Sequence, residues 1–77
     1  MTPAKTPIDT IAAPYGREIR LTEVDFDSGM RLLRITIREG ARYTILELDA
    51  PTAAHWGRSM ADWAAAQQDL NGGQRIP

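Results

Sequence analysis

The residues that could support nucleophilic catalysis lie close together in the C-terminal third of the chain. His55, Ser59 and Asp62 are spaced so that a helix would place all three on one side. A Ser-His-Asp set is catalytic when a pocket and an oxyanion hole accompany it, and nothing in the sequence supplies either. We therefore interpret the three residues as part of a solvated helix face. The sequence predicts no catalytic residues and a protein that is not an enzyme.

Acidic residues offer a second possible site, for a cation. Four carboxylates are grouped by the expected strands and turns, at Glu23, Asp25, Asp27 and Glu47. Their spacing does not match an EF-hand loop, and Arg31 is expected among them, so we interpret the group as solvated ion pairs. The chain has no cysteine and a single histidine, and no helix follows Gly72-Gly73 to cradle a phosphate. The sequence thus predicts neither a metal site nor a bound cofactor.

Arginine is the residue type with the clearest binding potential. Arg20, Arg34 and Arg42 are expected side by side on three neighbouring strands, as candidate contacts for an anionic partner. The guanidinium group is a planar fork that suits carboxylates and phosphates. The other interpretation, which we favour, is an outward sheet face kept soluble by alternating charge. Proteins that bind single-stranded nucleic acid usually also present exposed aromatic side chains. Only Phe26 is expected on the same side of the sheet as these arginines.

Length and composition limit the remaining classes. With 77 residues the chain holds one domain at most, and no disulfide can staple its small core. The net charge of −1 gives no overall attraction to nucleic acid or to an anionic membrane. No apolar run approaches the ~18 residues of a membrane-spanning helix, and the Met1 end lacks the apolar block of a signal peptide. We expect a soluble cytoplasmic protein, and such small domains often gain stability by oligomerising.

Proline sets the expected domain boundary at the N-terminal end. Pro3, Pro7 and Pro14 interrupt the first fourteen residues, which argues against a helix or a regular strand there. Ile8 to Ala12 could still dock as a short edge strand. The predicted organisation is a flexible tail over residues 1–14, a single domain over 15–70 and a flexible tail over 71–77.

The domain is expected to contain three antiparallel strands, over residues 17–26, 30–37 and 41–48. Each connecting turn ends in glycine, at Gly29 and Gly40, which predicts three-residue loops whose last residue forms a G1 bulge. The first hairpin then pairs Phe26 with Met30, Asp25 with Arg31, Val24 with Leu32, Leu21 with Ile35 and Ile19 with Ile37. The second pairs Ile37 with Ala41, Ile35 with Tyr43, Leu33 with Ile45 and Arg31 with Glu47.

This register predicts two partly apolar faces. One is rich in isoleucine and carries Ile19, Leu21, Leu33, Ile35, Ile37, Tyr43 and Ile45. The other carries a smaller apolar cluster, which is the candidate interface: Val24, Phe26, Met30, Leu32, Leu46 and Leu48.

A C-terminal helix is expected to cover one of these faces. Asp49 or Thr52 provides the N-cap, and Trp56, Met60 and Trp63 recur at helical spacing. We place this apolar stripe on the isoleucine-rich face, so that the candidate interface stays uncovered.

The sequence therefore predicts an α+β fold, a three-stranded antiparallel β-meander followed by one C-terminal α-helix packed on one sheet face. The expected function is a non-catalytic protein-interaction module, because an uncovered apolar cluster usually marks an interface. Its partner would be a second copy, in a homodimer, or an unidentified protein, with no membrane and no metal involved. The alternative is a nucleic-acid-binding regulator that uses the arginine-bearing face.

Overall fold

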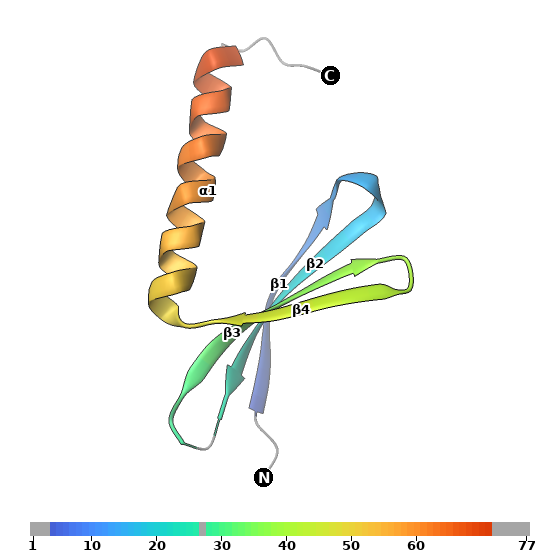
Figure 1. The fold of residues 1–77 in the computed structure, drawn as a ribbon, viewed down its shortest axis with the longest axis vertical. Helices are drawn as coiled ribbons and strands as arrows, with labels where there is room; N and C mark the ends of the chain where they lie inside the picture. Colours follow the sequence, from blue (N-terminus) through green and yellow to red (C-terminus); the bar gives the residue numbers. More distant parts are fainter. Residues whose placement is uncertain (1–3, 27, 72–77) are drawn as a thin grey trace.

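The computed structural model describes residues 4–26 and 28–71, with side chains up to residue 68 at the C-terminal end. In this part of the chain an antiparallel sheet of four strands, in the order β1-β2-β3-β4, precedes one α-helix (Figure 1). The elements are β1 (Ala4–Ala13), a 3-10 turn (Pro14–Gly16), β2 (Arg17–Asp25), β3 (Arg31–Glu39), β4 (Arg42–Leu48) and α1 (Ala50–Asn71). The predicted fold class is confirmed as α+β with an antiparallel sheet and a C-terminal helix.

The prediction of three strands is wrong, because the stretch interpreted as a flexible tail forms edge strand β1. It pairs with β2 from Ala4 opposite Asp25 to Ala13 opposite Arg17, with a register shift between Pro7 and Asp9. Proline is tolerated in a sheet at an edge or at a bulge, and Pro7 occupies both kinds of position. The edge strand considered over Ile8 to Ala12 is therefore present, and it is longer. The predicted C-terminal tail lies outside the described residues from residue 72 onward.

The β2–β3 hairpin has the predicted register. Leu21 lies opposite Ile35 and Asp25 lies opposite Arg31. At the turn, the Phe26 amide donates to the Met30 carbonyl at 2.8 Å, and the Gly29 amide donates to the Phe26 carbonyl at 3.0 Å. Gly29 has a φ of +87°, as the left-handed residue of a G1 bulge requires.

The predicted register of the β3–β4 hairpin is wrong. Glu39 lies opposite Arg42 and Ile35 lies opposite Leu46, so the loop has two residues, Gly40 and Ala41. Gly40 leads this loop with a φ of +60°, the pattern of a type II′ turn rather than of a bulged loop. The change moves every β4 pairing by three residues. Because three is odd, each β4 side chain lies on the face opposite to the predicted one.

Helix α1 begins as predicted but does not pack as predicted. Asp49 is the N-cap, and its Oδ1 accepts a hydrogen bond from the Thr52 amide at 2.9 Å. The hydrogen bonds from Thr52 lower the pKa of this exposed carboxyl below its ordinary value. After its first turns the helix leaves the sheet instead of covering it (Figure 1). Within the described residues no helix is long and apolar enough to cross a membrane.

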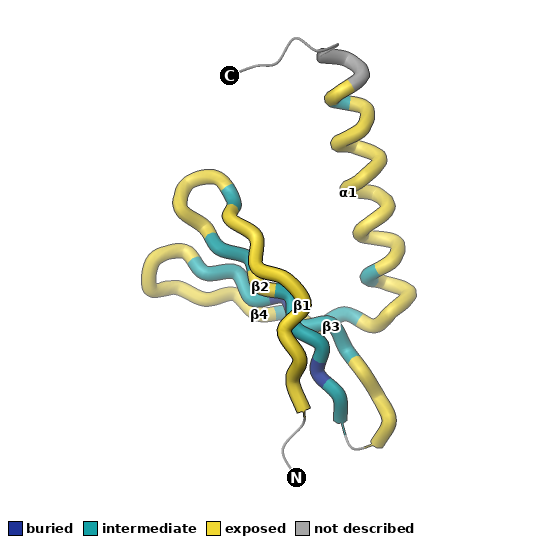
Figure 2. The backbone as a smooth tube through the Cα atoms, turned by 180° about the vertical axis from the view of Figure 1, so that it is seen from behind, coloured by how far each residue is buried: buried dark blue, intermediate teal, exposed yellow. Residues whose placement is uncertain are grey.

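The packed core is very small for a chain of this length. Among the described residues only Val24, at 0% exposure, and Ile35, at 7%, are buried hydrophobic side chains. Figure 2 shows that half-buried segments gather in the middle of the sheet, whereas the helix is exposed along nearly its whole length. The radius of gyration is 15.6 Å, against about 11 Å for a compact chain of this size. Much of the apolar surface is therefore not packed against any other described residue.

Candidate interaction surfaces

The first surface is one side of the sheet, which we call the isoleucine face. The observed pairings put apolar side chains from all strands on this side. They are Ile8, Ile11, Ile19, Leu21, Leu33, Ile35, Ile37, Leu46 and Leu48. Most of them are half-buried, while Ile8 and Ile11 on the edge strand are exposed. The face is therefore a broad apolar area that the described part of the chain does not cover.

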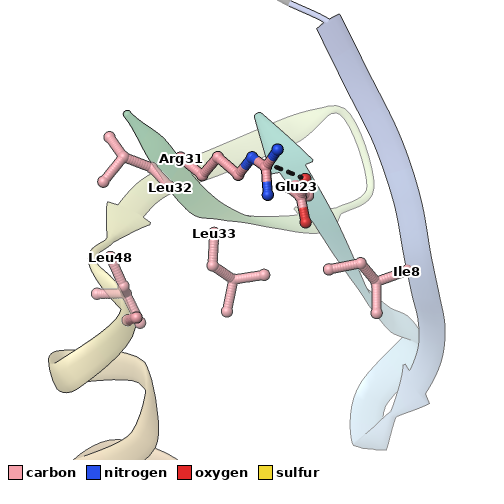
Figure 3. A pocket seen from close by; sticks show the side chains of 7 residues that line it. Ile8, Glu23, Arg31, Leu32, Leu33 and Leu48 are labelled. Atoms are coloured by element: carbon pink, nitrogen blue, oxygen red, sulfur yellow. Dashed lines mark ion pairs between the residues drawn. The ribbon is translucent and has the colours of Figure 1, made fainter. Parts of the chain in front are cut away.

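A shallow hollow of about 160 Å³ lies at one end of the isoleucine face (Figure 3). Ile8 from β1 and Leu33 from β3 point toward the same space, and Leu48 and Ala50 line it on the side of the helix. The ion pair between Arg31 and Glu23, drawn in Figure 3, closes the far side at 3.9 Å. The hollow is open to solvent and mostly apolar.

Charged residues border the isoleucine face at both ends, and between these ends the face is apolar except for Asp9 on the edge strand β1, opposite Leu21. At one end Arg31 pairs with Asp25 at 3.4 Å as well as with Glu23. At the other end the Arg17 guanidinium pairs with the Glu39 carboxylate. An apolar centre with a polar rim is the usual anatomy of a protein–protein interface.

The candidate interface predicted from the sequence does not form one patch. Val24 and Leu32 lie opposite each other on the other side of the sheet, and the alternation places Phe26 and Met30 there too. Leu46 and Leu48 belong instead to the isoleucine face, because the β3–β4 register differs from the predicted one. Val24 is also fully buried, so it offers no surface to a partner.

The second surface is an apolar stripe on α1, which we call the tryptophan stripe. It consists of Ala53, Trp56, Met60 and Trp63, spaced by three or four residues along one side of the helix. Ala53, in the first turn of the helix, is half-buried, whereas Trp56, Met60 and Trp63 are 39%, 54% and 67% exposed. The stripe therefore becomes more exposed along the helix, and the described residues do not cover it.

The third surface is the opposite side of the sheet, which we call the arginine face. It carries Glu18, Arg20, Thr22, Arg34, Thr36, Arg38 and Glu47. Arg20 and Arg34 share this face as predicted, but Arg42 lies on the isoleucine face opposite Glu39. The predicted arginine trio is therefore divided.

Carboxylates already engage the arginines of this face. The Arg34 guanidinium donates to Glu47 Oε2 from Nε at 2.9 Å and from Nη2 at 2.6 Å. The Arg20 Nε lies 2.9 Å from Glu18 Oε1, and the Arg38 Nε lies 3.6 Å from the same oxygen. An anionic partner would have to displace these carboxylates.

The remaining candidates from the sequence include His55 and Ser59, which lie beside Trp56 of the tryptophan stripe. His55 and Ser59 line a shallow, open depression near the start of α1, and Asp62 does not line it. Over residues 4–26 and 28–68, no group of three or more histidine, cysteine, aspartate or glutamate side chains could hold a metal ion.

The contribution of β1 to the isoleucine face is not among the features predicted from the sequence. Ile8 and Ile11 are three residues apart, so they do not alternate as neighbours on one face of a regular strand should. The register shift between Pro7 and Asp9 places Ile8 and Ile11 on the same side of the sheet. In the sequence, the local feature that could have indicated this common side is Pro7, because proline within a strand is compatible with a bulge.

The architecture defines a small α+β protein built from consecutive β-hairpins and a C-terminal helix. The chain belongs to a family of unknown function, DUF6967, whose model matches residues 2–66 and thus the whole sheet and most of the helix. No curated protein and no solved structure matches it.

Proposed function

We propose that the chain is a non-catalytic interaction module. It associates with itself as a homodimer, or it is a subunit of a larger assembly. The observation that carries the proposal is the pair of uncovered apolar surfaces, the isoleucine face and the tryptophan stripe, in a chain with almost no core. Large exposed apolar patches on small proteins usually mark interaction sites.

The free energy available from covering these surfaces is large. The exposed parts of Trp56, Met60 and Trp63 amount to roughly 400 Å² of mostly apolar surface, given the size of aromatic side chains. At about 25 cal/mol per Å², burying one such stripe contributes roughly 10 kcal/mol before the entropic costs of association. The two stripes of a dimer together contribute roughly 20 kcal/mol. After the costs of association, a net gain of roughly 8 kcal/mol is enough for a micromolar dissociation constant.

The nucleic-acid alternative has less support. Its arginines are paired with Glu18 and Glu47, and the chain carries a net charge of −1. The register does bring exposed Tyr43 to the arginine face, opposite Arg38, but a single tyrosine is a weak stacking platform. Salt-dependent binding to DNA or RNA would revive this alternative. The cytoplasmic location stays a prediction from composition.

Sedimentation equilibrium at ~10–100 μM, a range suited to micromolar affinities, tests self-association directly. We expect the wild type to show a mass above that of the 8.5 kDa chain. Met60→Glu should return the monomer mass because it places a charge in the tryptophan stripe. Ala61→Glu is the matched control, since the next residue is exposed on another side of the helix and should leave association unchanged.

A wild type that sediments as a monomer over this range would contradict the proposal. Equal loss of association in Met60→Glu and Ala61→Glu would also contradict it, because the stripe would then have no special role.

A further inference from the structure

We infer that the partner is a second copy of this chain and that the two copies exchange helices. The tryptophan stripe of each α1 docks on the isoleucine face of the other copy, in a two-fold arrangement. This inference rests on the proposed self-association and names its geometry.

The two surfaces match in chemistry. The tryptophan stripe presents Trp56, Met60 and Trp63, and it needs a surface without charges at its centre. On β2, β3 and β4 the isoleucine face provides this, because its charged residues lie at the two ends. The exception is Asp9 on the edge strand β1, opposite Leu21. The arginine face is less suitable, because the Arg34–Glu47 ion pair lies in the central part of β3 and the ion pairs of Glu18 lie at one end.

The lengths of the two surfaces are compatible. The tryptophan stripe, from Ala53 to Trp63, spans about 15 Å at 1.5 Å per residue. The nine residues of β3 span about 30 Å at 3.3 Å per residue. The stripe therefore fits within the length of the isoleucine face.

The connection between β4 and α1 explains why the helix does not cover its own sheet. Only Asp49 separates Leu48, the last residue of β4, from Ala50, the first residue of α1. Connections between a strand and a helix that packs back on the same sheet commonly have 2–6 residues. A helix that leaves its sheet on so short a tether is available to another copy, which is the geometry of domain swapping.

Reciprocal docking buries enough surface for a stable dimer. Each copy contributes one stripe and one sheet face, and the four contributions together amount to roughly 1,500 Å², the size of an ordinary specific interface. A dimer that paired only the two helices would bury about half of that and would leave both isoleucine faces uncovered.

Because the chain has no cysteine, single introduced cysteines report directly on which surfaces meet. Met60→Cys labels the tryptophan stripe, and Thr44→Cys labels the isoleucine face opposite Ile37. The two full-length variants are mixed at ~100 μM, where micromolar complexes form, allowed to exchange subunits and treated with a short bis-maleimide. Intact mass spectrometry identifies each covalent product.

We expect the mixed product, which joins one Met60→Cys chain to one Thr44→Cys chain, to exceed either symmetric product several-fold. The control pairs replace one label with its neighbour on another side, Ala61→Cys for the helix or Ile45→Cys for the sheet. Ile45 lies on the arginine face opposite Thr36, so both control pairs should give several-fold less covalent dimer.

Each other outcome overturns the inference. If the product that joins two copies of Met60→Cys dominates, the helices pair with each other, and self-association stands without helix exchange. If no covalent dimer forms and sedimentation shows monomers, self-association fails as well. If a chain carrying both substitutions links its two cysteines only within itself, the helix folds back on its own sheet.

Discussion

Arg34 on β3 and Glu47 on β4 are direct cross-strand partners, and both guanidinium hydrogen bonds go to the same carboxylate oxygen, at 2.9 and 2.6 Å. Their side chains are 27% and 31% exposed, so solvent weakens the pair without removing it. We expect a double-mutant cycle on Arg34→Gln and Glu47→Gln to give a coupling of about 0.5–1 kcal/mol in urea unfolding.

The matched control is the same cycle on Arg31→Gln and Glu47→Gln. The register predicted from the sequence pairs Arg31 with Glu47, whereas in the structure Arg31 forms ion pairs with Glu23 and Asp25. This second cycle should therefore show almost no coupling. The opposite result, coupling of Glu47 to Arg31 and none to Arg34, would support the bulged register predicted from the sequence.

The difference between the two hairpins shows what local sequence can decide. Asp25 opposite Arg31 and Leu21 opposite Ile35 are favourable pairs, and Gly29 suits the bulge, so all signals for the first hairpin agree. For the second hairpin, a glycine at position 40 is compatible with two turns. It can be the last residue of a bulged three-residue loop or the first residue of a two-residue loop. The apolar residues of β4 populate both of its faces, so the hydrophobic pattern could not choose between them.

The position of the helix depended on information that the sequence pattern does not contain. The sequence predicts the N-cap at Asp49 and the helical spacing of Trp56 and Trp63, because capping and periodicity are local properties. Where the stripe docks depends on the length of the β4–α1 connection and on the twist of the sheet. An amphipathic helix indicates that another surface covers its apolar side. It does not indicate whether that surface belongs to the same chain or to a second one.

The two-residue turn makes Gly40 sensitive to substitution. Its φ of +60° is unfavourable for a β-branched residue, although an added Cβ would meet no atom within 4 Å. We expect Gly40→Val to lower the stability by about 1–3 kcal/mol through backbone strain alone. Ala41→Val changes the next residue, which has no positive φ, and should cost far less. Equal melting temperatures for Gly40→Val and the wild type would mean that the turn has another conformation.

Val24 should dominate the stability of the sheet, since it is the fully buried side chain of the described residues. Removing two methyl groups there, in Val24→Ala, should cost about 1–3 kcal/mol, the lost transfer energy plus a cavity term. Ile45→Ala is the control on the same face, because Ile45 is 57% exposed and loses little buried surface. Chemical denaturation of the two variants should separate them clearly, and similar losses would contradict a core centred on Val24.

The cap at Asp49 predicts a pH dependence of the helix. Because hydrogen bonds from Thr52 lower the pKa of Asp49 below 3.8, the folded state binds this proton less tightly than the unfolded state. The stabilisation is complete above the ordinary pKa and is lost as the pH falls through the lower folded value. Asp49→Asn keeps a good cap that does not titrate. Circular dichroism should show wild-type helicity falling below that of Asp49→Asn only in this acidic range, and parallel curves would exclude the cap as the cause.

The tryptophans should report helix docking through their fluorescence. Trp63 is 67% exposed and Trp56 is 39% exposed in the single chain, so docking on a second copy changes the surroundings of Trp63 most. In Trp56→Phe, where only Trp63 emits, dilution from ~100 μM to below the micromolar range should shift the emission to longer wavelengths, because dissociation returns the indole to water. Acrylamide quenching of Trp63 should rise several-fold over the same dilution. Trp63→Phe, which reports Trp56, the less exposed of the two tryptophans, should show a smaller change. A Trp63 emission that is water-like at every concentration would mean that nothing covers the stripe, whereas a blue-shifted emission that dilution does not alter would mean that the helix docks within its own chain.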